Sequence, residues 1–238
     1  MLSVRGVDAF YGSAQVLWSV DLDVGAGEIV AVMGPNGSGK STILKVIMGL
    51  LPPRSGAVTF RGQDLTALPA HARVELGISY VLERRRLFPM MTVAENLQMG
   101  AYARRDRKAV HRTLDWVESL FPVIAERRHQ LAGRMSGGEQ QMVAIARGLM
   151  SEPSLLLLDE PFLGLAPRVV THVLDLIQKV NGEGIAVIFN EQNVHLSFGS
   201  AHRGYLLESG RVMLQGSGLE MLAHETVRRV YLGEGAAA

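Results

Sequence analysis

The stretch Gly34-Pro35-Asn36-Gly37-Ser38-Gly39-Lys40-Ser41 decides the fold, because it has the glycine spacing and the Lys-Ser ending of a phosphate-binding loop. The apolar run 29–33 precedes it and the apolar segment 42–50 follows it. A strand before the loop and a helix after it are the context that this motif requires. Its glycines let successive backbone N–H groups point at one anion, at the positive end of the helix. The sequence therefore predicts a phosphate site at a helix start.

Two carboxylates downstream extend this site. Asp159 and Glu160 directly follow the apolar run 155–158, at the carboxyl end of an expected strand, where α/β sheets bind ligands. Lys40 is expected to span the β- and γ-phosphates of ATP, with the Ser41 hydroxyl and Asp159 holding Mg²⁺. Glu160 is expected to polarise the water that attacks the γ-phosphate.

The distribution of apolar runs predicts an α/β fold. Short β-branched runs indicate strands at residues 4–7, 20–24, 29–33, 57–60, 78–82, 155–158 and 185–189. Three of these, at 29, 155 and 185, lack alternation, as expected of parallel strands that are covered on both faces. The early runs are separated by glycine turns at Gly25-Ala26-Gly27 and Gly62, so they predict an antiparallel edge.

Between residues 92 and 150 the apolar spacing becomes helical, with Val110, Leu114, Val117 and either Leu120 or Phe121 on one face. We therefore expect a mixed-sheet core with an antiparallel β subdomain and an inserted helical subdomain. The core would comprise residues 1–85 and 151–238, and the insertion residues 86–150.

Composition excludes several classes of protein. The 238 residues carry 24 basic and 23 acidic side chains, and the net charge of +1 gives no general attraction for nucleic acid or anionic lipid. The absence of cysteine excludes disulfides, thiolate nucleophiles and cysteine zinc sites. No apolar run reaches the about 18 residues of a membrane span, and the first ten residues do not form a signal peptide. The Gly-Ala tail after Leu232 is expected to fray.

A second motif, Met135-Ser136-Gly137-Gly138-Glu139-Gln140-Gln141, opens a helical stretch. It resembles the signature motif of ABC transporter ATPases. Together with the phosphate loop and Asp159-Glu160, the resemblance runs from Tyr11 to the end of the chain. It implies the fold of a P-loop NTPase ABC cassette, with residues 1–238 as one ATPase domain. In that family, Ser136, Gly137, Gly138 and Glu139 would face the γ-phosphate of the partner subunit's ATP in a head-to-tail dimer.

The resemblance also assigns the remaining ATP-binding residues. Tyr11 would stack on the adenine, with Val16 packed beside it. The residues around the phosphates would be Gly34, Pro35, Asn36, Gly37, Ser38, Gly39, Lys40, Ser41 and Thr42. The loop Pro161 to Pro167 resembles the family's D-loop and would line the dimer interface.

Two positions depart from the common family pattern. Glu83 occupies the Q-loop position, often glutamine, beside the Mg²⁺ site, and it would join Ser41 and Asp159 as a metal ligand. Gln192 occupies the switch position that is usually histidine; it can donate a hydrogen bond to a γ-phosphate but cannot carry a proton. Glu160, Gln192 and Glu83 are thus the expected catalytic residues. His195 is expected to be solvated or to cap a helix.

The loop around Glu83 departs further. Leu82 and Arg84 stand where the family usually has proline and glycine, which affects the loop geometry. The run Arg84-Arg85-Arg86 is either a solvated charge run or a docking surface for a membrane partner.

Four strings, at residues 51–56, 88–97, 163–167 and 191–193, look most like the cassettes of branched-chain amino-acid importers. Urea or amide importers and lipopolysaccharide-export cassettes are similar too. The resemblance implies ATP-driven uptake at the cytoplasmic face of the inner membrane. It also implies two transmembrane permeases, a second cassette expected to be a different chain, and a periplasmic or lipid-anchored substrate-binding protein.

Two other functions compete with transport. A nucleic-acid-binding module could use the basic residues Arg104, Arg105, Arg107, Lys108 and Arg112, but the net charge of +1 supplies little long-range field, so no nucleic-acid partner is expected. An inactive nucleotide sensor would explain Gln192 and Leu82. The intact Glu160 argues against it.

Overall fold

The computed structural model describes residues 1–231, so the tail that was expected to fray lies outside the described residues. Contacts divide the chain into two compact units. Unit 1 contains Met1–Arg73 and the residues from Ala186 onward, and unit 2 contains Val74–Ile185. Among residues 1–231, no helix is both long and apolar enough to cross a membrane.

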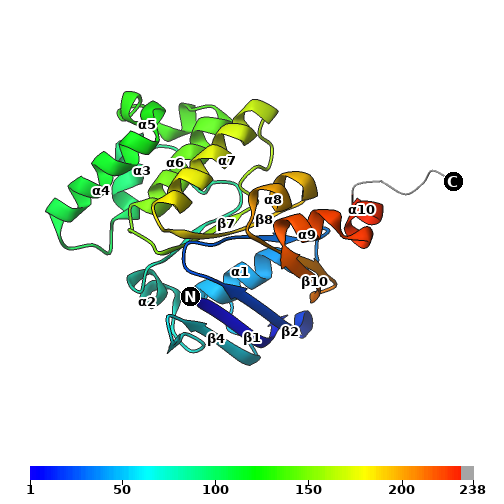
Figure 1. The fold of residues 1–238 in the computed structure, drawn as a ribbon. Helices are drawn as coiled ribbons and strands as arrows, with labels where there is room; N and C mark the ends of the chain where they lie inside the picture. Colours follow the sequence, from blue (N-terminus) through cyan, green and yellow to red (C-terminus); the bar gives the residue numbers. More distant parts are fainter. Residues whose placement is uncertain (232–238) are drawn as a thin grey trace. The chain divides into compact units, whose positions relative to one another are not determined.

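Unit 1 combines strands from both ends of the chain (Figure 1). Its elements are β1 (Leu2–Tyr11), β2 (Ala14–Val24), β3 (Ile29–Met33), α1 (Lys40–Met48), β4 (Ser55–Phe60), β5 (Gln63–Asp64), β8 (Ala186–Glu191), α8 (Val194–Ser200), β9 (Arg203–Glu208), β10 (Arg211–Ser217), α9 (Gly218–Ala223) and α10 (Glu225–Tyr231). The helix α2 (Ala70–Glu75) spans the point where the chain passes into unit 2.

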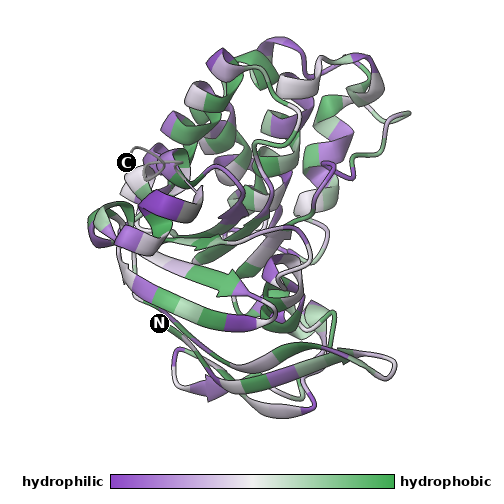
Figure 2. Cartoon of the chain, turned by 90° about the vertical axis from the view of Figure 1, so that its right-hand side faces the viewer, coloured by the Kyte–Doolittle hydropathy of each residue, from purple (hydrophilic) through white to green (hydrophobic). Residues whose placement is uncertain are grey.

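The first strands form an antiparallel sheet in the order β2-β1-β4-β5, as the glycine turns between the early runs predict. Burial alternates at the start of β1, where Leu2 and Val4 are buried and Arg5 is exposed, and Figure 2 shows the chain coloured by hydropathy. This is the pattern of a sheet with one face on the core and one face in water.

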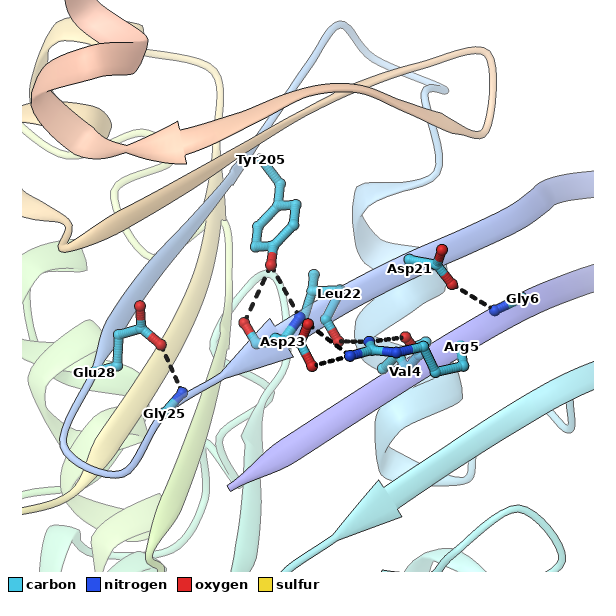
Figure 3. A network of polar contacts seen from close by, with 9 residues as sticks. All are labelled: Val4, Arg5, Gly6, Asp21, Leu22, Asp23, Gly25, Glu28 and Tyr205. Atoms are coloured by element: carbon cyan, nitrogen blue, oxygen red, sulfur yellow. Dashed lines mark hydrogen bonds and ion pairs between the residues drawn. The ribbon is translucent and has the colours of Figure 1, made fainter.

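A network of polar contacts links β1 to β2 and links β2 to β9 (Figure 3). Both Asp23 carboxylate oxygens accept hydrogen bonds from Arg5 Nη2, at 2.7 and 2.8 Å. The Tyr205 hydroxyl accepts a bond from the Asp23 backbone N–H at 3.0 Å. Burial raises the pKa of Tyr205, so this phenol stays protonated and can donate to the Asp23 carbonyl.

Unit 1 also contains four strands of a second sheet. In this sheet, β3 pairs in parallel with both β8 and β9, and β9 pairs antiparallel with β10. Every residue of β3 and β8 is buried, as the absence of alternation in these runs predicts. The expected mixture of parallel and antiparallel pairing is therefore confirmed. β3 leads directly into the phosphate-loop sequence and α1.

Helix α1 is held at its carboxyl end by a buried cation. The Arg73 side chain is 1% exposed and makes no ion pair within the described residues. Its guanidinium instead donates to five backbone carbonyls, those of Val46, Ile47, Leu65, Leu68 and Thr66. Two of these carbonyls belong to the last turn of α1, where a positive charge interacts favourably with the negative end of the helix dipole. Burial lowers the pKa of Arg73, as expected for a desolvated cation.

Replacement of Arg73 by methionine is expected to destabilise the protein by about 2 kcal/mol, because the carbonyls that it satisfies would be left buried without donors. Chemical denaturation measures the effect. The control is Arg54→Met, because Arg54 is more exposed and stacks on Phe10 at 4.9 Å. Equal loss of stability in the two variants would contradict the role assigned to the Arg73 hydrogen bonds.

Unit 2 is mainly helical between residues 93 and 149, as the spacing predicts (Figure 1). Its elements are β6 (Ile78–Val81), α3 (Val93–Gly100), α4 (Arg107–Leu120), α5 (Pro122–Glu126), the 3₁₀ turn η1 (Ala132–Arg134), α6 (Gly137–Leu149), β7 (Leu155–Asp159) and α7 (Pro167–Gly182). Strands β6 and β7 pair in parallel. Helix α6 contacts α3, α4 and α5, so it is the centre of the helical group.

Helix starts in unit 2 follow from local sequence. Thr92 and Glu95 form a capping box at α3, Ser136 and Glu139 form another at α6, and Pro167 occupies the first turn of α7. These are residues that favour helix N-termini. The predicted apolar face of α4 is confirmed at Val117 and the following Phe121, which are fully buried, whereas Val110 and Leu114 are half-buried.

Candidate functional site

The phosphate-loop sequence lies between β3 and α1 in unit 1, as predicted. Gly34 has φ +152°, and an added Cβ would lie 2.1 Å from the Leu207 carbonyl oxygen. Gly39 has φ +102° and immediately precedes Lys40, the first residue of α1. Both positions therefore require glycine, and the backbone turns sharply enough to aim its N–H groups at one point.

The turn between β9 and β10 braces this loop. The Gly210 N–H donates to the Ser38 carbonyl at 3.0 Å, and the Gly210 carbonyl accepts from the Trp18 N–H at 2.9 Å. An added Cβ on Gly210 would lie 2.0 Å from the Val16 carbonyl oxygen. A residue more than 170 positions downstream thus fixes the loop on β2.

Two polar groups in the loop fit an anion. Lys40 is 4% exposed, and its Nζ donates to the carbonyls of Gly34 at 2.9 Å and Pro35 at 3.0 Å, which aims its charge back across the loop. The Ser38 hydroxyl is buried with no hydrogen-bond partner within the described residues. A cation and an unsatisfied donor on a glycine turn at a helix start are the features of a phosphate site.

Tyr11 lies at the end of β1, with 45% of its surface exposed. Lys45 of α1 donates to its hydroxyl at 3.4 Å and lies 5.7 Å from the centre of its ring. The ring is thus exposed enough to stack on a base while Lys45 limits its movement. Val16, also expected at the adenine, is half-buried on β2. The contact between Lys45 and Tyr11 could not be predicted, because residue spacing does not show that a helix residue lies at the end of a distant strand.

Gln192, the predicted switch residue, lies immediately after β8 and is exposed. Its backbone N–H donates to Glu191 Oε2 at 3.2 Å. Asn190, which sequence reasoning missed, is fully buried on β8 and donates to the Ser41 hydroxyl at 3.4 Å. Asn193 caps α8, so the exposed His195 is not a helix cap.

In unit 2, Asp159 ends β7 and is 4% exposed. Its Oδ2 accepts a hydrogen bond from the Tyr80 hydroxyl of β6 at 2.6 Å, which fixes the orientation of the carboxylate. Glu160 follows with φ +46°, a left-handed conformation that costs about 1–2 kcal/mol for a residue with a Cβ. Backbone strain of this kind is found where a side chain must be aimed. Sequence reasoning identified both carboxylates but missed Tyr80.

Glu83 lies two residues beyond β6 and pairs with Arg84 at 3.1 Å. Arg84, Arg85 and Arg86 have φ of +60°, +64° and +47°, three left-handed residues in succession. The loop at which Leu82 and Arg84 depart from the family pattern therefore has an uncommon backbone turn.

Oxygen donors of the kind that Mg²⁺ prefers are present at each predicted metal ligand. Ser41 supplies a hydroxyl from unit 1, while Asp159 and Glu83 supply carboxylates from unit 2. Each of these oxygen donors, taken by itself, is of the kind that a hard divalent cation binds.

The signature residues open α6. The Ser136 hydroxyl accepts from the Glu139 N–H at 3.4 Å, and Glu139 Oε2 accepts from the Ser136 N–H at 2.8 Å. This hydrogen bond from the Ser136 backbone lowers the pKa of Glu139, which also pairs with Arg127 at 3.1 Å. Gly138 has no room for a side chain, because an added Cβ would lie 2.5 Å from Val169. Ser136 is thus a helix cap, and Gly137 and Gly138 place no side chain of their own at the helix start.

Glu139→Gln is expected to lower the free energy of unfolding by about 0.5–1 kcal/mol at pH 7, because the amide caps less strongly than a carboxylate. Since the folded pKa of Glu139 lies below its ordinary value of 4.5, the difference is complete above that pH and shrinks as pH falls through the folded pKa. Urea titrations at several pH values between 3 and 7 measure it. A difference between the two proteins that does not change with pH would contradict this assignment.

The predicted residues divide between the two units. Unit 1 holds the phosphate loop, Thr42, Tyr11, Val16 and Gln192, and unit 2 holds Glu83, Asp159, Glu160 and the signature residues.

Comparison with known proteins places these features in context. Residues 17–163 match the family model described as ABC transporter. The chain is 43% identical to the high-affinity branched-chain amino acid transport ATP-binding protein BraG of Pseudomonas aeruginosa, over 98% of the chain and 100% of BraG. It is 38% identical to the probable branched-chain amino acid transport ATP-binding protein LivF of Archaeoglobus fulgidus, over 98% and 99%. The identity to the lipopolysaccharide export system ATP-binding protein LptB of Escherichia coli is 34%, over 98% and 97%.

Solved structures are similar as well. A nucleotide-free ATP-binding cassette from an ABC transporter matches with a TM-score of 0.87 and 25% identity, over 98% of the chain and 99% of that structure. The dimeric post-hydrolysis state of another cassette, bound to ADP and Pi, matches with a TM-score of 0.80 and 25% identity, over 91% and 98%. These likenesses confirm the expected cassette fold.

Proposed function

The chain belongs to the ABC transporter family, and on that premise we propose that it powers the uptake of branched-chain or related amino acids by hydrolysing ATP. The observation that carries the substrate class is the 43% identity to BraG over the whole length of that protein. The lower identity of 34% to LptB makes lipopolysaccharide export the second candidate.

ATP binding would fall to unit 1. The Tyr11 ring would stack on the adenine with Val16 beside it, and the loop from Gly34 to Thr42 would surround the phosphates. Lys40 would turn from the loop carbonyls to the β- and γ-phosphates. Its hydrogen bonds to the charged phosphates would be stronger than the hydrogen bonds to the carbonyls that it gives up.

Hydrolysis would depend on the carboxylates of unit 2. Glu160 would orient and deprotonate the attacking water, and the strained backbone at this residue would hold the carboxylate in its direction. Gln192 would donate a hydrogen bond to the γ-phosphate without exchanging a proton. Ser41, Asp159 and Glu83 would hold Mg²⁺, which neutralises charge on the phosphate oxygens when it is bound. Tyr80 would keep Asp159 in place.

A second cassette would complete each ATP site. The bare helix start at Gly137 and Gly138, with Ser136 and Glu139, would face the γ-phosphate held by the partner. Pairing with a different cassette chain is our proposal for the assembled transporter. The domain that pairs would span residues 1–238, with an α/β core of 1–85 and 151–238 and a helical subdomain of 86–150.

Membrane partners would bind the helical side. In unit 2, Met90 is 82% exposed and Tyr102 85% exposed, and Leu82, Phe88 and Met99 are also exposed. Large exposed apolar side chains are typical of surfaces that a protein partner covers. We propose two permease subunits at this surface, a cytoplasmic-face location on the inner membrane, and a periplasmic or lipid-anchored binding protein that delivers the substrate.

Affinity purification of the tagged full-length chain from detergent-solubilised native membranes tests this proposal. Recovery of a second cassette and two hydrophobic permeases, with ATPase activity stimulated by a binding protein loaded with a branched-chain amino acid, is the expected result. Stimulation by a urea-loaded binding protein would replace the substrate class, and recovery of lipopolysaccharide-export components would favour the second candidate. Recovery of ribosomes or nucleic acid would overturn the transport proposal while leaving ATP hydrolysis intact.

A further inference from the structure

The loop that follows β6 has a backbone shape that its own sequence does not favour. Arg84, Arg85 and Arg86 all carry a Cβ, yet each adopts a positive φ between +47° and +64°. The left-handed region is crowded for such residues, so three in succession persist only where neighbouring groups hold them. The turn begins directly after Glu83.

Arg147 supplies the contacts that hold it. This residue lies in the last turn of α6, and its Nη1 and Nη2 donate to the carbonyls of Arg86 at 2.9 Å and Arg85 at 3.1 Å. Its guanidinium also lies 5.7 Å from the centre of the Phe88 ring. A planar fork with two donors can bond two adjacent carbonyls together, which an ammonium group cannot do in the same way.

The same turn also reaches the other end of α6. Arg85 Nη1 donates to Gln140 Oε1 at 3.4 Å. The Arg85 guanidinium nitrogens lie only 3.2 and 3.3 Å from the place where a Cβ would stand on Gly137. The loop after Glu83 is therefore fastened to the helix that begins with the signature residues, at both its first and its last turn.

We propose that Arg147 is a positioning residue for ATP hydrolysis: it holds the strained turn 84–86 and so couples the Glu83 loop to the signature helix. Glu83 and Ser136 then keep a fixed relation within unit 2. This inference rests on the proposed function, in which Glu83 serves one ATP and Ser136 serves the partner's ATP. The proposed function assigns Arg147 no contact with either nucleotide.

A glycine substitution in the strained turn can distinguish the positioning role of Arg147 from a general contribution to stability. Glycine adopts a positive φ without the crowding that a Cβ brings. The Arg86 side chain is exposed, and within residues 1–231 it makes no hydrogen bond or ion pair of its own. Arg86→Gly should therefore make the turn less dependent on Arg147 while leaving the contact between Arg85 and Gln140 in place.

The test compares the full-length wild type with Arg147→Gln, Arg147→Lys, Arg86→Gly and the double variant Arg147→Gln/Arg86→Gly. We expect Arg147→Gln to lower kcat at least about tenfold with KM for ATP within about twofold, because misplacement of a reacting group costs rate more than binding. Arg147→Lys should fall between the wild type and Arg147→Gln, and it serves if Arg147→Gln does not fold. Arg86→Gly alone should stay within about twofold of wild type, and the double variant should regain at least about fivefold over Arg147→Gln.

Hydrogen exchange provides a readout that does not depend on activity. Amides of residues 84–88 should exchange faster in Arg147→Gln and return toward wild-type rates in the double variant. Unchanged exchange in Arg147→Gln, an unchanged kcat, or a folded double variant no more active than the single one would each overturn the proposal. If wild type itself hydrolyses no ATP, the proposed function fails, and the exchange rates still decide whether Arg147 holds the turn.

Discussion

Replacement of Glu160 by glutamine is expected to lower the turnover number for ATP by at least about a thousandfold while ATP affinity stays within about threefold. The amide keeps the size and hydrogen-bonding reach of the side chain but cannot take a proton from water. Affinity is spared because the phosphate loop, Lys40 and Tyr11 all belong to unit 1, whereas Glu160 belongs to unit 2.

Dimer formation in the presence of ATP is a second measurement of the loss of hydrolysis in Glu160→Gln. A cassette that binds ATP but does not cleave it should accumulate as a dimer with the nucleotide between the partners, which size-exclusion chromatography with and without ATP would measure. The matched control is Glu152→Gln, because Glu152 also has a positive φ but pairs with Arg104 at 2.8 Å and is assigned no role in the reaction. Wild-type turnover in Glu160→Gln would overturn the assignment of this residue as the base.

Replacement of Lys40 by alanine is expected to weaken ATP binding about a hundredfold, since it removes a charged donor from two phosphate groups. The affinity for AMP should change little, because AMP lacks the β- and γ-phosphates that Lys40 would bind. Titration of both nucleotides by calorimetry or fluorescence measures the contrast.

Lys45→Ala is the control for this experiment. Lys45 has the same charge and lies on the same helix, but it contacts Tyr11 instead of the loop carbonyls. It should weaken ATP and AMP about equally and by no more than about fivefold, because both nucleotides carry the adenine that Tyr11 would stack on. An equal loss of ATP and AMP affinity in Lys40→Ala would show that the variant damages the loop instead of removing a phosphate contact.

The elements of this fold that could be predicted are those with a local signal. The run 29–33 has no alternation because both faces of β3 are covered, and the glycines at 34 and 39 mark the turn that follows. The helix start at Gly137 is predictable because Ser136 and Glu139 form a capping box within four residues. In each case the cause lies inside the segment itself.

What could not be predicted depends on partners that are distant in sequence. Tyr80 faces Asp159 across 79 residues, and Asn190 faces Ser41 across 149. Strand pairing brings these groups together, and no spacing in the chain records it. The strands β9 and β10 were missed as well, because their residues do not form an apolar run of the kind that marks β3.

The backbone around Glu83 illustrates a third limit. The sequence shows that proline and glycine are replaced by Leu82 and Arg84, but not which conformation results. Three left-handed arginines contradict local preference, and the contacts that hold them include Arg147, 61 residues away from Arg86. Local rules fail where a distant side chain imposes the conformation.

The bond between Gly210 and the Ser38 carbonyl has a consequence for how the chain is made. A ribosome adds about 5–20 residues per second, so roughly 10–35 s separate the synthesis of these two residues. Throughout that interval the nascent chain already contains every residue of the phosphate loop, yet it lacks the turn that braces the loop's shape. This contact with the phosphate loop is therefore made late in biosynthesis, even though the sequence motif of the loop appears within the first fifth of the chain.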